Sequence, residues 1–173
     1  MKNAQKFRAI GLMSGTSLDG VDIAYVEFEQ NEKWKFNLGI CDTIPYDEKW
    51  KNQLSNLYKQ SSKEIKQTDI KYGLYLGDLA LKFIQTNKLQ VDFICSHGHT
   101  IFHKPDKNYT LQIGNGQSIA NKSKQTVICD FRSLDVSLGG QGAPLVPIGD
   151  QLLFEDYDYC LNIGGISNLS FQK

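Results

Sequence analysis

The sequence predicts an α/β protein, and three observations lead to that prediction. Two apolar runs, 7–13 and 21–28, flank a turn rich in glycine, serine, threonine and aspartate, which is the pattern of a β-hairpin. Apolar residues between 47 and 87 recur at the spacing of helices. A second apolar hairpin with a glycine turn, over 158–171, repeats the design of the first.

The composition is that of a globular protein with a balanced surface. The chain has 173 residues, enough for one domain or for one domain and part of another, and 40% of them are hydrophobic. Lys and Arg number 19, as do Asp and Glu, so neither nucleic acid nor an anionic membrane is expected as a partner. The N-terminus lacks the apolar core of a signal peptide, so the sequence predicts a cytoplasmic protein.

The four cysteines do not form a metal-binding or disulfide pattern. They lie far apart in apolar, strand-like runs without a Cys-x-x-Cys pair, at Cys41, Cys95, Cys129 and Cys160. This spacing predicts buried, reduced thiols of a cytosolic protein rather than disulfides or zinc ligands.

The N-terminal third predicts an antiparallel meander followed by two helices. The three strands are expected over 7–13, 21–29 and 33–43, with Trp34, Phe36 and Leu38 on one face of the third. A first helix is expected near 47–60. A second is expected near 68–87, capped by Thr68 and with its buried stripe at Ile70, Leu74, Gly77, Leu81 and Ile84.

The remaining elements alternate between short strands and short helices. Strands are expected over 91–96, 109–113 and 126–129. Helices are expected over 116–124 and 147–154, the second of them after a glycine-proline loop at 138–147. The second hairpin then pairs 158–164 with 167–171 around a turn at 164–166.

The first glycine turn has the residues of a phosphate site. Gly15 and Gly20 let the backbone approach a ligand closely, and successive N–H groups of such a turn can form a concavity that holds phosphate oxygens. Asp19 and Asp22 supply carboxylates for the Mg²⁺ that accompanies a nucleotide. The alternative is a solvated turn without a ligand. The sequence has neither a P-loop nor the glycine pattern of a Rossmann dinucleotide site.

Three histidines raise an alternative hypothesis of a zinc hydrolase. His97, His99 and His103 are separated by even numbers of positions, so their side chains would share a face on one extended strand, as a zinc site requires. Pro105 follows closely, however, and no Cys or carboxylate of matching spacing lies within the run. The pattern therefore favours the phosphate site over the zinc site.

Six motifs, taken together and in this order, resemble the N-terminal portion of the anhydro-N-acetylmuramic acid kinases. They are Gly11-Leu-Met-Ser-Gly-Thr-Ser-Leu-Asp-Gly-Val-Asp22, Ser96-His-Gly-His-Thr100, Leu111-Gln-Ile-Gly-Asn115, Asp130-Phe-Arg132, Gly139-Gly-Gln-Gly-Ala-Pro-Leu-Val-Pro147 and Leu161-Asn-Ile-Gly-Gly-Ile-Ser-Asn168.

The resemblance implies a fold and a reaction. The fold is the ribonuclease-H-like domain of the superfamily of actin, the Hsp70 chaperones and sugar kinases. Domain I would cover 1–155, and 156–173 would be the first hairpin of a truncated domain II. The implied reaction uses ATP and water to convert 1,6-anhydro-N-acetylmuramic acid, an amino sugar, into N-acetylmuramic acid 6-phosphate and ADP in peptidoglycan recycling. Water attacks the anomeric carbon, and the released O6 takes the γ-phosphoryl group.

The resemblance also assigns residues to the two ligands. Thr100 and Arg132 would lie on the sugar side with Asp130 nearby, because the planar guanidinium of an Arg suits a carboxylate such as the lactyl group. Asp19 and Asp22 would hold Mg²⁺. The ATP phosphates would contact two turns, at Gly15, Thr16, Ser17, Leu18, Asp19, Gly20, Val21 and Asp22, and at Asn162, Gly164, Gly165 and Ser167.

The sequence departs from the family pattern in three ways. Family members are about twice as long, and their general base is an Asp expected after Lys173, so no residue of this chain is assigned as catalytic. We therefore expect the chain alone to be inactive. An unpaired strand edge and an uncovered apolar face predict that 156–173 is either poorly supported or paired with another molecule, and a homodimer is one such pairing. His99 stands where the family block has Gln, and both side chains can hydrogen-bond a sugar.

Two other functions remain open on these residues. One is a non-catalytic half that binds nucleotide or sugar. The other is a sugar kinase of the same fold with a different substrate. Turnover in the presence of the missing half would separate the first from a kinase, whereas the choice of sugar depends on side-chain positions.

Overall fold

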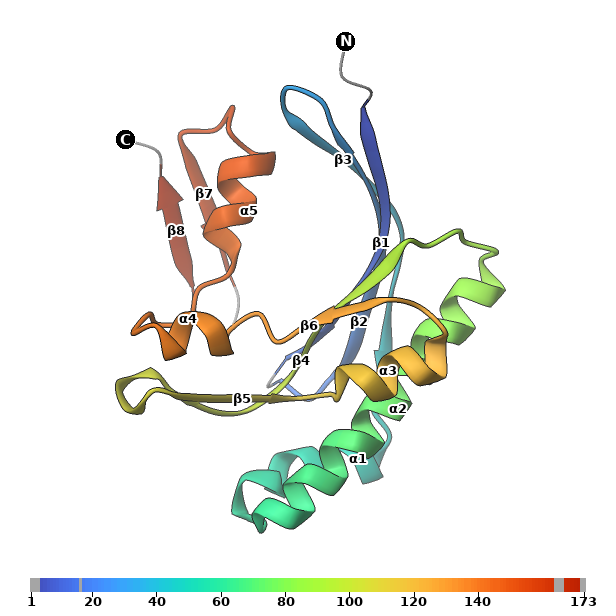
Figure 1. The fold of residues 1–173 in the computed structure, drawn as a ribbon, viewed down its shortest axis with the longest axis vertical. Coiled ribbons are helices and arrows are strands. Elements are labelled where there is room, and N and C mark those ends of the chain that lie inside the picture. The colour runs from blue at the N-terminus through green and yellow to red at the C-terminus, as the bar shows by residue number, and fades with distance from the viewer. Residues whose placement is uncertain (1–3, 16, 164–166, 172–173) are drawn as a thin grey trace.

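The computed structural model describes residues 4–15, 17–163 and 167–171, which form a six-stranded mixed sheet, a separate two-stranded sheet and their covering helices (Figure 1). The α/β class predicted from the sequence is confirmed. The order of the large sheet is β3-β2-β1-β4-β5, and β6 also pairs with β4.

The first three strands form the predicted antiparallel meander. They are β1 (Gln5–Ser14), β2 (Gly20–Gln30) and β3 (Trp34–Pro45). The β1–β2 register runs from Gln5 opposite Gln30 to Met13 opposite Asp22, so the glycine turn lies directly beyond the last pair. β3 is the edge of the sheet and most of its residues are exposed.

β4 (Phe93–Lys104) changes partners along its length and is longer than the predicted strand over 91–96. Its first half pairs in parallel with β1 and with β6 (Val127–Cys129), and its second half pairs antiparallel with β5 (Tyr109–Ile113). A 3₁₀ turn, η2 (Pro105–Lys107), joins β4 to β5. Gly98 lies where the strand changes partners and has a positive φ of 72°, a backbone conformation that glycine adopts without strain.

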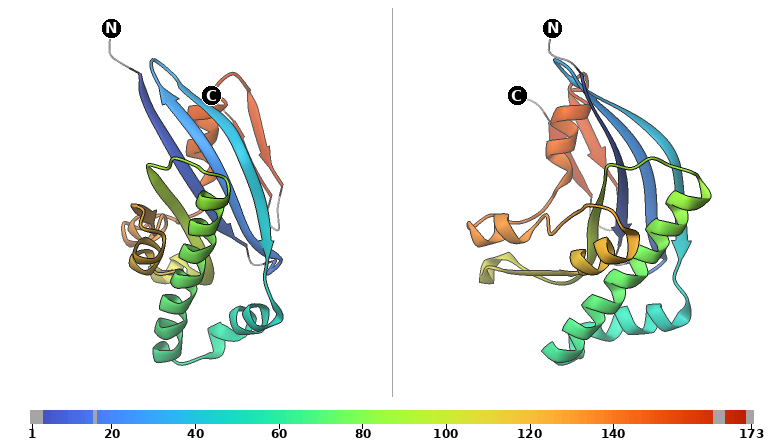
Figure 2. Two further views of the ribbon diagram at one scale, coloured as in Figure 1. Left: turned by 90° about the vertical axis from the view of Figure 1, so that its right-hand side faces the viewer. Right: turned by 45° about the vertical axis from the view of Figure 1, so that its right-hand side comes forward.

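One face of the sheet is covered by helices. Figure 2 shows α2 (Ser62–Thr86) crossing this face, with α1 (Glu48–Asn56) and the 3₁₀ turn η1 (Leu57–Lys59) before it and α3 (Gly116–Ser123) beside it. The hydrophobic core lies between this face and α2. Its fully buried side chains include Ile10, Val21, Ile23, Tyr72, Leu76, Ala80, Ile94, Ile113 and Ile119.

Two predictions for α2 are wrong. The helix is capped by Ser61, which forms a capping box with Glu64, and Thr68 lies buried inside it and accepts a hydrogen bond from Gln53. The predicted buried stripe is wrong at Ile70 and Leu74, which are exposed, and right at Gly77 and Ile84, which are buried. The buried face of α2 also includes Tyr72, Leu76 and Phe83. Gly77 does pack closely, as predicted, since a Cβ there would lie 2.8 Å from the Lys122 side chain.

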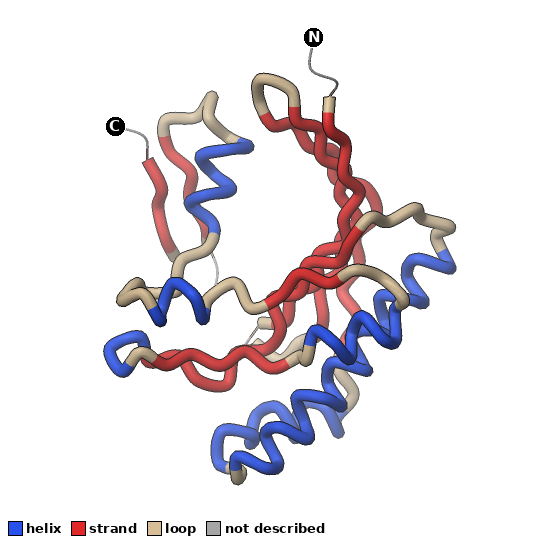
Figure 3. The backbone as a smooth tube through the Cα atoms, in the orientation of Figure 1, coloured by secondary structure: helices blue, strands red, loops and turns tan. Residues whose placement is uncertain are grey.

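The C-terminal elements lie on the other side of the sheet from α2 (Figures 1 and 2). They are the unpredicted short helix α4 (Ser133–Ser137), the predicted helix α5 (Val146–Leu153), and the hairpin of β7 (Tyr159–Asn162) with β8 (Asn168–Phe171). Figure 3 shows that α5, β7 and β8 are adjacent to one another. Phe154, just after α5, packs edge-on against Phe36 of β3 at 5.6 Å between ring centroids.

The prediction of buried cysteines is wrong for two of the four. Cys41 and Cys129 are exposed, and Cys95 and Cys160 are partly buried. Cys41 is exposed because β3 is an edge strand with little covering it. All four are free thiols, as predicted. In the part of the chain that the structure describes, no helix has the length and apolarity required to span a membrane.

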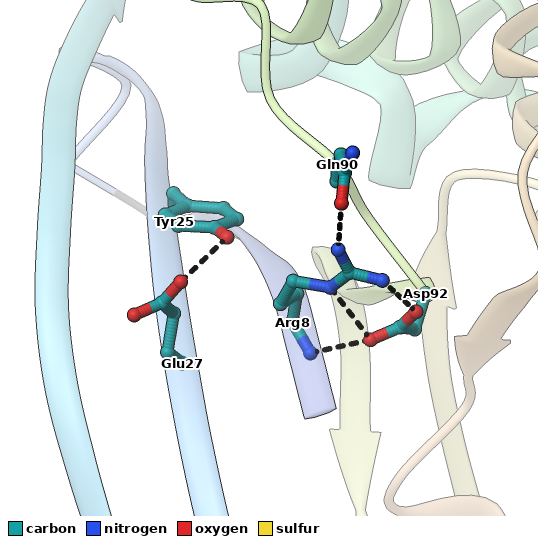
Figure 4. Close-up of polar contacts among 5 residues, drawn as sticks. All are labelled: Arg8, Tyr25, Glu27, Gln90 and Asp92. Atoms are coloured by element: carbon teal, nitrogen blue, oxygen red, sulfur yellow. Dashed lines mark hydrogen bonds and ion pairs between the residues drawn. The ribbon is translucent and has the colours of Figure 1, made fainter. Parts of the chain in front are cut away.

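A charged cluster ties the start of β1 to the segment before β4 (Figure 4). The Arg8 guanidinium donates to both carboxylate oxygens of Asp92, at 2.8 and 3.2 Å, and also to Gln90. The Asp92 carboxylate also accepts the Arg8 backbone N–H at 2.8 Å, and its pKa is lowered by these bonds. This bidentate pair fixes the parallel alignment of β1 and β4 at the end opposite the glycine turn.

Candidate functional site

Three residues of the first glycine turn, Ser17, Asp19 and Gly20, are hydrogen-bonded to one another. The Asp19 carboxylate accepts hydrogen bonds from the Ser17 hydroxyl at 2.8 Å and from the Gly20 N–H at 2.9 Å. Both bonds stabilise the ionised form, with that from Ser17 the stronger influence, and so they lower the pKa of Asp19. Asp19 is therefore ionised at neutral pH, and the turn carries its negative charge.

Contacts with the rest of the protein fix two residues of this turn, Gly20 and Leu18. Gly20 leaves no room for a side chain, because a Cβ there would lie 2.3 Å from the carbonyl oxygen of Ile44 on β3. Leu18 has a positive φ of 58°, which is uncommon for a residue other than glycine, and its side chain packs against the hydrophobic core. The turn is therefore held by the adjacent strand and by the core.

The last three residues of the predicted phosphate loop, Gly20 to Asp22, belong to β2. Val21 is fully buried in the core, so only its backbone can reach a ligand. Asp22 is exposed, and its carboxylate accepts a hydrogen bond from Thr43 of β3 at 2.6 Å. Thr16, which was also predicted to bind phosphate, lies outside the described residues.

Behind the turn lies a buried hydrogen-bond network that was not predicted. The Ser14 hydroxyl, at the end of β1, is 2.6 Å from the Tyr46 hydroxyl and 3.1 Å from His99 Nδ1. The Tyr46 hydroxyl in turn hydrogen-bonds that of Tyr72 on α2. All four side chains are buried. The network therefore joins β1, the end of β3, α2 and β4 at one point directly beneath the turn.

Burial sets the protonation states in this network. Burial lowers the pKa of His99 to about 4, with a smaller contribution from His97, so the imidazole is neutral near pH 7. Burial also raises the pKa values of Tyr46 and Tyr72, so both phenols are protonated. The network is thus made of neutral groups that can hydrogen-bond without an unpaired buried charge.

The residues assigned to the sugar lie on β4 and on the segment after β6. Thr100 is partly buried, and its hydroxyl accepts a hydrogen bond from Gln112 of β5 at 3.3 Å. Asp130 is exposed, has a positive φ of 59°, and accepts the Ser133 N–H at the start of α4 at 3.2 Å. Thr100 thus lies in the second half of β4, and Asp130 directly follows β6, which pairs with the first half of β4.

Arg132 connects β4 to the glycine-proline loop. Its Nε and Nη2 lie 3.0 and 2.8 Å from His97 Nε2, and its Nη1 donates to the carbonyl of Gly142 at 2.5 Å. His97 Nε2 is therefore an acceptor, and its Nδ1 carries the proton that bonds the Gly98 carbonyl at 3.0 Å. Burial is the main cause of the lowered pKa of His97, and the charge of Arg132 adds to it.

A cavity of about 220 Å³ lies beside the part of β4 where pairing with β6 stops and pairing with β5 starts. Its wall includes Asp69 of α2, Ser96, His97 and Asp130. The Ser96 hydroxyl is fully buried and has no hydrogen-bond partner among the described residues. This polar cavity lies beside the Arg132–His97 contact and has room for ordered water.

The second hairpin has the predicted strands, but only two of its four predicted phosphate-binding residues are among the described residues. Asn162 is partly buried and Ser167 is exposed. Gly164 and Gly165 lie outside the described residues, as does Ile166. The clearest polar contact of this hairpin is from Ser170, whose hydroxyl donates to Asp150 of α5 at 2.7 Å.

The three histidines engage different partners, which does not support the zinc hypothesis. His97 binds Arg132, His99 contacts Ser14, and His103 Nδ1 is 3.1 Å from the Thr110 hydroxyl. Among the residues that the structure describes, no three or more His, Cys, Asp or Glu side chains form a group suited to a metal.

Sequence reasoning identified the turn but missed the residues that support it. Tyr46 and Tyr72 belong to no motif and become neighbours only when α2 packs on the sheet. The contact between His97 and Arg132 joins two of the six motifs, so the presence of both in one family pattern was the signal that could have suggested it. Ser14 was also signalled, because it directly precedes Gly15.

Comparison with known proteins identifies the family of kinases that this chain resembles. A family model described as anhydro-N-acetylmuramic acid kinase matches residues 7–173. A protein named anhydro-N-acetylmuramic acid kinase from Mannheimia succiniciproducens is 41% identical over 172 residues, which cover 93% of this chain and 45% of the relative.

Other relatives with the same name agree. The protein from Sulfurimonas denitrificans is 36% identical over 174 residues, covering 95% of this chain and 46% of the relative. The protein from Pasteurella multocida is 39% identical over 181 residues, covering 98% and 47%. The chain thus spans about half the length of the curated relatives it matches.

Proposed function

The chain belongs to the anhydro-N-acetylmuramic acid kinase family, and from this premise we propose that it forms the half of such a kinase that holds the ATP phosphates and one side of the sugar. The reaction is the ATP-dependent conversion of 1,6-anhydro-N-acetylmuramic acid and water into N-acetylmuramic acid 6-phosphate and ADP. Water adds to the anomeric carbon, the bond from that carbon to the bridging oxygen breaks, and the released O6 accepts the γ-phosphoryl group.

The observation that carries the proposal is the compact turn between β1 and β2. Phosphoryl transfer depends mostly on positioning and charge neutralisation, and a turn that is hydrogen-bonded and packed against β3 at the end of a central strand supplies positioning. Gly20 lets the turn lie against Ile44 so closely that no side chain fits between them. The backbone from Gly15 to Asp22 is therefore proposed to contact the phosphates, together with Asn162 and Ser167 of the second hairpin.

The charge of Asp19 fits a divalent cation at this turn. An ionised carboxylate next to a triphosphate is unfavourable unless a cation lies between them. Mg²⁺ is commonly held by one or two carboxylates, phosphate oxygens and water, so a larger group of protein ligands is not required. We assign Asp19 as the nearer carboxylate and Asp22 as the second, and the bound ion would neutralise charge on the phosphates.

Arg132 and Thr100 are proposed to contact the sugar. After its bonds to His97 and Gly142, the Arg132 guanidinium retains N–H groups that can donate to a carboxylate, and these bonds fix its orientation. The lactyl group of the sugar is such a carboxylate. Thr100 and Asp130 supply a hydroxyl and an acceptor beside it for the sugar hydroxyl and amide groups.

The topology supports the finer fold assignment that we propose. Three antiparallel strands followed by parallel β4 and β6, with helices between them, match the order expected of a ribonuclease-H-like domain of the actin, Hsp70 and sugar-kinase superfamily. Residues 1–155 form domain I in this proposal, and 156–173 begin domain II. The free thiols suit a reducing compartment, and we propose a cytoplasmic location.

The test supplies the half of the relatives that this chain does not match. The chain is mixed with the C-terminal half of the Pasteurella multocida relative, Mg²⁺, ATP and the anhydro sugar, and the product is measured by mass spectrometry. We expect the 6-phosphate to form only when all components are present. A stable complex of the two halves that binds ATP without phosphorylating the sugar would contradict the kinase and favour a binding module.

A further inference from the structure

Tyr46 contacts both ends of the glycine turn. Its backbone N–H donates to the carbonyl of Asp19 at 3.2 Å, at the end of the turn that enters β2. Its hydroxyl is 2.6 Å from the hydroxyl of Ser14, at the end that leaves β1. One buried residue of the segment after β3 therefore bridges the two ends of the turn.

Two other elements also hydrogen-bond the Ser14 and Tyr46 hydroxyls. Tyr72 of α2 hydrogen-bonds the Tyr46 hydroxyl, and His99 of β4 hydrogen-bonds the Ser14 hydroxyl. Aromatic packing holds Tyr46 in place, since its ring centroid is 6.4 Å from that of Tyr72 and 6.3 Å from that of Tyr75. His99 is adjacent in the chain to Thr100, so the network also reaches the strand assigned to the sugar.

We propose that Tyr46 and His99 are positioning residues that hold the glycine turn in its binding conformation before a nucleotide arrives. This inference rests on the proposed function of the turn. A turn fixed in advance loses less conformational freedom on binding, and this raises its affinity for phosphate groups. The bonds also set the distance between the phosphate turn and Thr100.

The first test removes the Tyr46 hydroxyl. Tyr46→Phe keeps the aromatic ring but breaks the bonds to Ser14 and Tyr72. Loss of a buried hydrogen bond predicts that the amides of 17–20 exchange hydrogen about tenfold faster and that ATP binds about tenfold more weakly. Hydrogen exchange with mass spectrometry on the nucleotide-free chain and calorimetric titration with Mg-ATP measure the two effects.

Tyr75→Phe is the matched control. Tyr75 packs against Tyr46 in the same aromatic cluster, but among the described residues its hydroxyl has no contact with the turn. Tyr75→Phe also removes a tyrosine hydroxyl from this cluster, so we expect hydrogen exchange in the turn and ATP affinity to stay unchanged.

His99 gives a second, independent pair of variants. His99→Asn places a polar atom near the position of Nδ1 and is expected to retain most of the ATP affinity, whereas His99→Leu removes the hydrogen bond to Ser14. We expect His99→Leu to weaken ATP binding about tenfold, and a residue with a packing role alone would not distinguish these substitutions. In the complex with the C-terminal half, His99→Leu should raise KM for ATP more than it lowers kcat.

The outcomes separate this inference from the proposed function. A wild-type chain that binds no ATP contradicts the phosphate site, while hydrogen exchange still tests the fixing of the turn. Wild-type exchange and affinity in Tyr46→Phe would overturn the inference and leave the proposed function standing. A uniform rise in exchange over β1, α2 and the turn would also overturn it, because Tyr46 would then support the whole fold rather than the turn.

Discussion

The two glycine hairpins share a local sequence pattern but differ in what surrounds them. The β1–β2 hairpin lies in the middle of a six-stranded sheet, and its side chains Ile10 and Ile23 are almost completely buried under α2. The β7–β8 hairpin forms a sheet of its own, in which Leu161 and Phe171 remain 63% and 58% exposed.

The difference teaches that a glycine turn alone does not make a rigid site. The first turn is bonded by Tyr46, placed against Ile44 and supported by His99, all of which come from other elements. The second hairpin is held to α5 by the bond between Ser170 and Asp150. The contacts that hold the first turn therefore come from tertiary packing, which the local pattern does not encode.

The largest expected effect tests whether the two hairpins differ in burial energy. Ile23→Ala creates a cavity in the core and should lower the free energy of unfolding by about 2–5 kcal/mol. The same change at the exposed Ile163, next to β7, should alter it by less than about 0.5 kcal/mol. Urea denaturation measures both. Equal losses at the two positions would remove the energetic basis of the comparison.

The next effect tests the neutral His99 beneath the first turn. Its folded pKa of about 4 lies below that of an unfolded histidine, so the unfolded chain binds the additional proton between those values. Stability contributed by His99 is therefore complete above about pH 6.5 and falls by up to about 3 kcal/mol as the pH drops to about 4.

His99→Asn should remove this part of the pH dependence, whereas His103→Asn leaves the buried group in place and serves as its control. Denaturation midpoints between pH 4 and 7 provide the measurement. A wild-type and a His99→Asn chain with parallel pH profiles would show that His99 is not held neutral by burial.

The smallest effects compare glycines in the two regions. Gly20→Ala should destabilise the chain by about 1–3 kcal/mol, because the added Cβ would meet the carbonyl oxygen of Ile44 at 2.3 Å. Gly149 of α5 has open space around it, so Gly149→Ala should stabilise its helix by about 0.5–1 kcal/mol. Thermal unfolding of both variants gives the signs, and a tolerated Gly20→Ala would contradict the close packing of the first turn.

Local patterns were sufficient to predict most strands and the position of the first turn. Apolar runs on either side of the glycine turn located β1 and β2, alternation located β3, and helical spacing located α1 and most of α2. The start of α2 was missed because Thr68 was chosen as the cap, although the Ser61–Glu64 capping box provides a stronger local signal. Ile70 and Leu74 follow the helical period but face solvent, since the sheet covers a different side of α2.

The candidate site was predictable only in part for the same reason. The residue types of the glycine turn suit phosphate, whereas Thr100 and Arg132 were assigned from the family resemblance of their motifs. The bridge by Tyr46 depends on residues far apart in sequence that meet through the packing of α2 and β3. The contact of Arg132 with His97 likewise requires the end of β6 to lie beside β4.

The most direct test of the central claim follows backbone amide signals by NMR while Mg-ATP is added to the chain. A preformed phosphate turn predicts that the amides of 17–22 shift most strongly, and that their hydrogen exchange is already slower than that of 167–171 before nucleotide is added. Signals of 17–22 that do not change at saturating ATP would contradict the account.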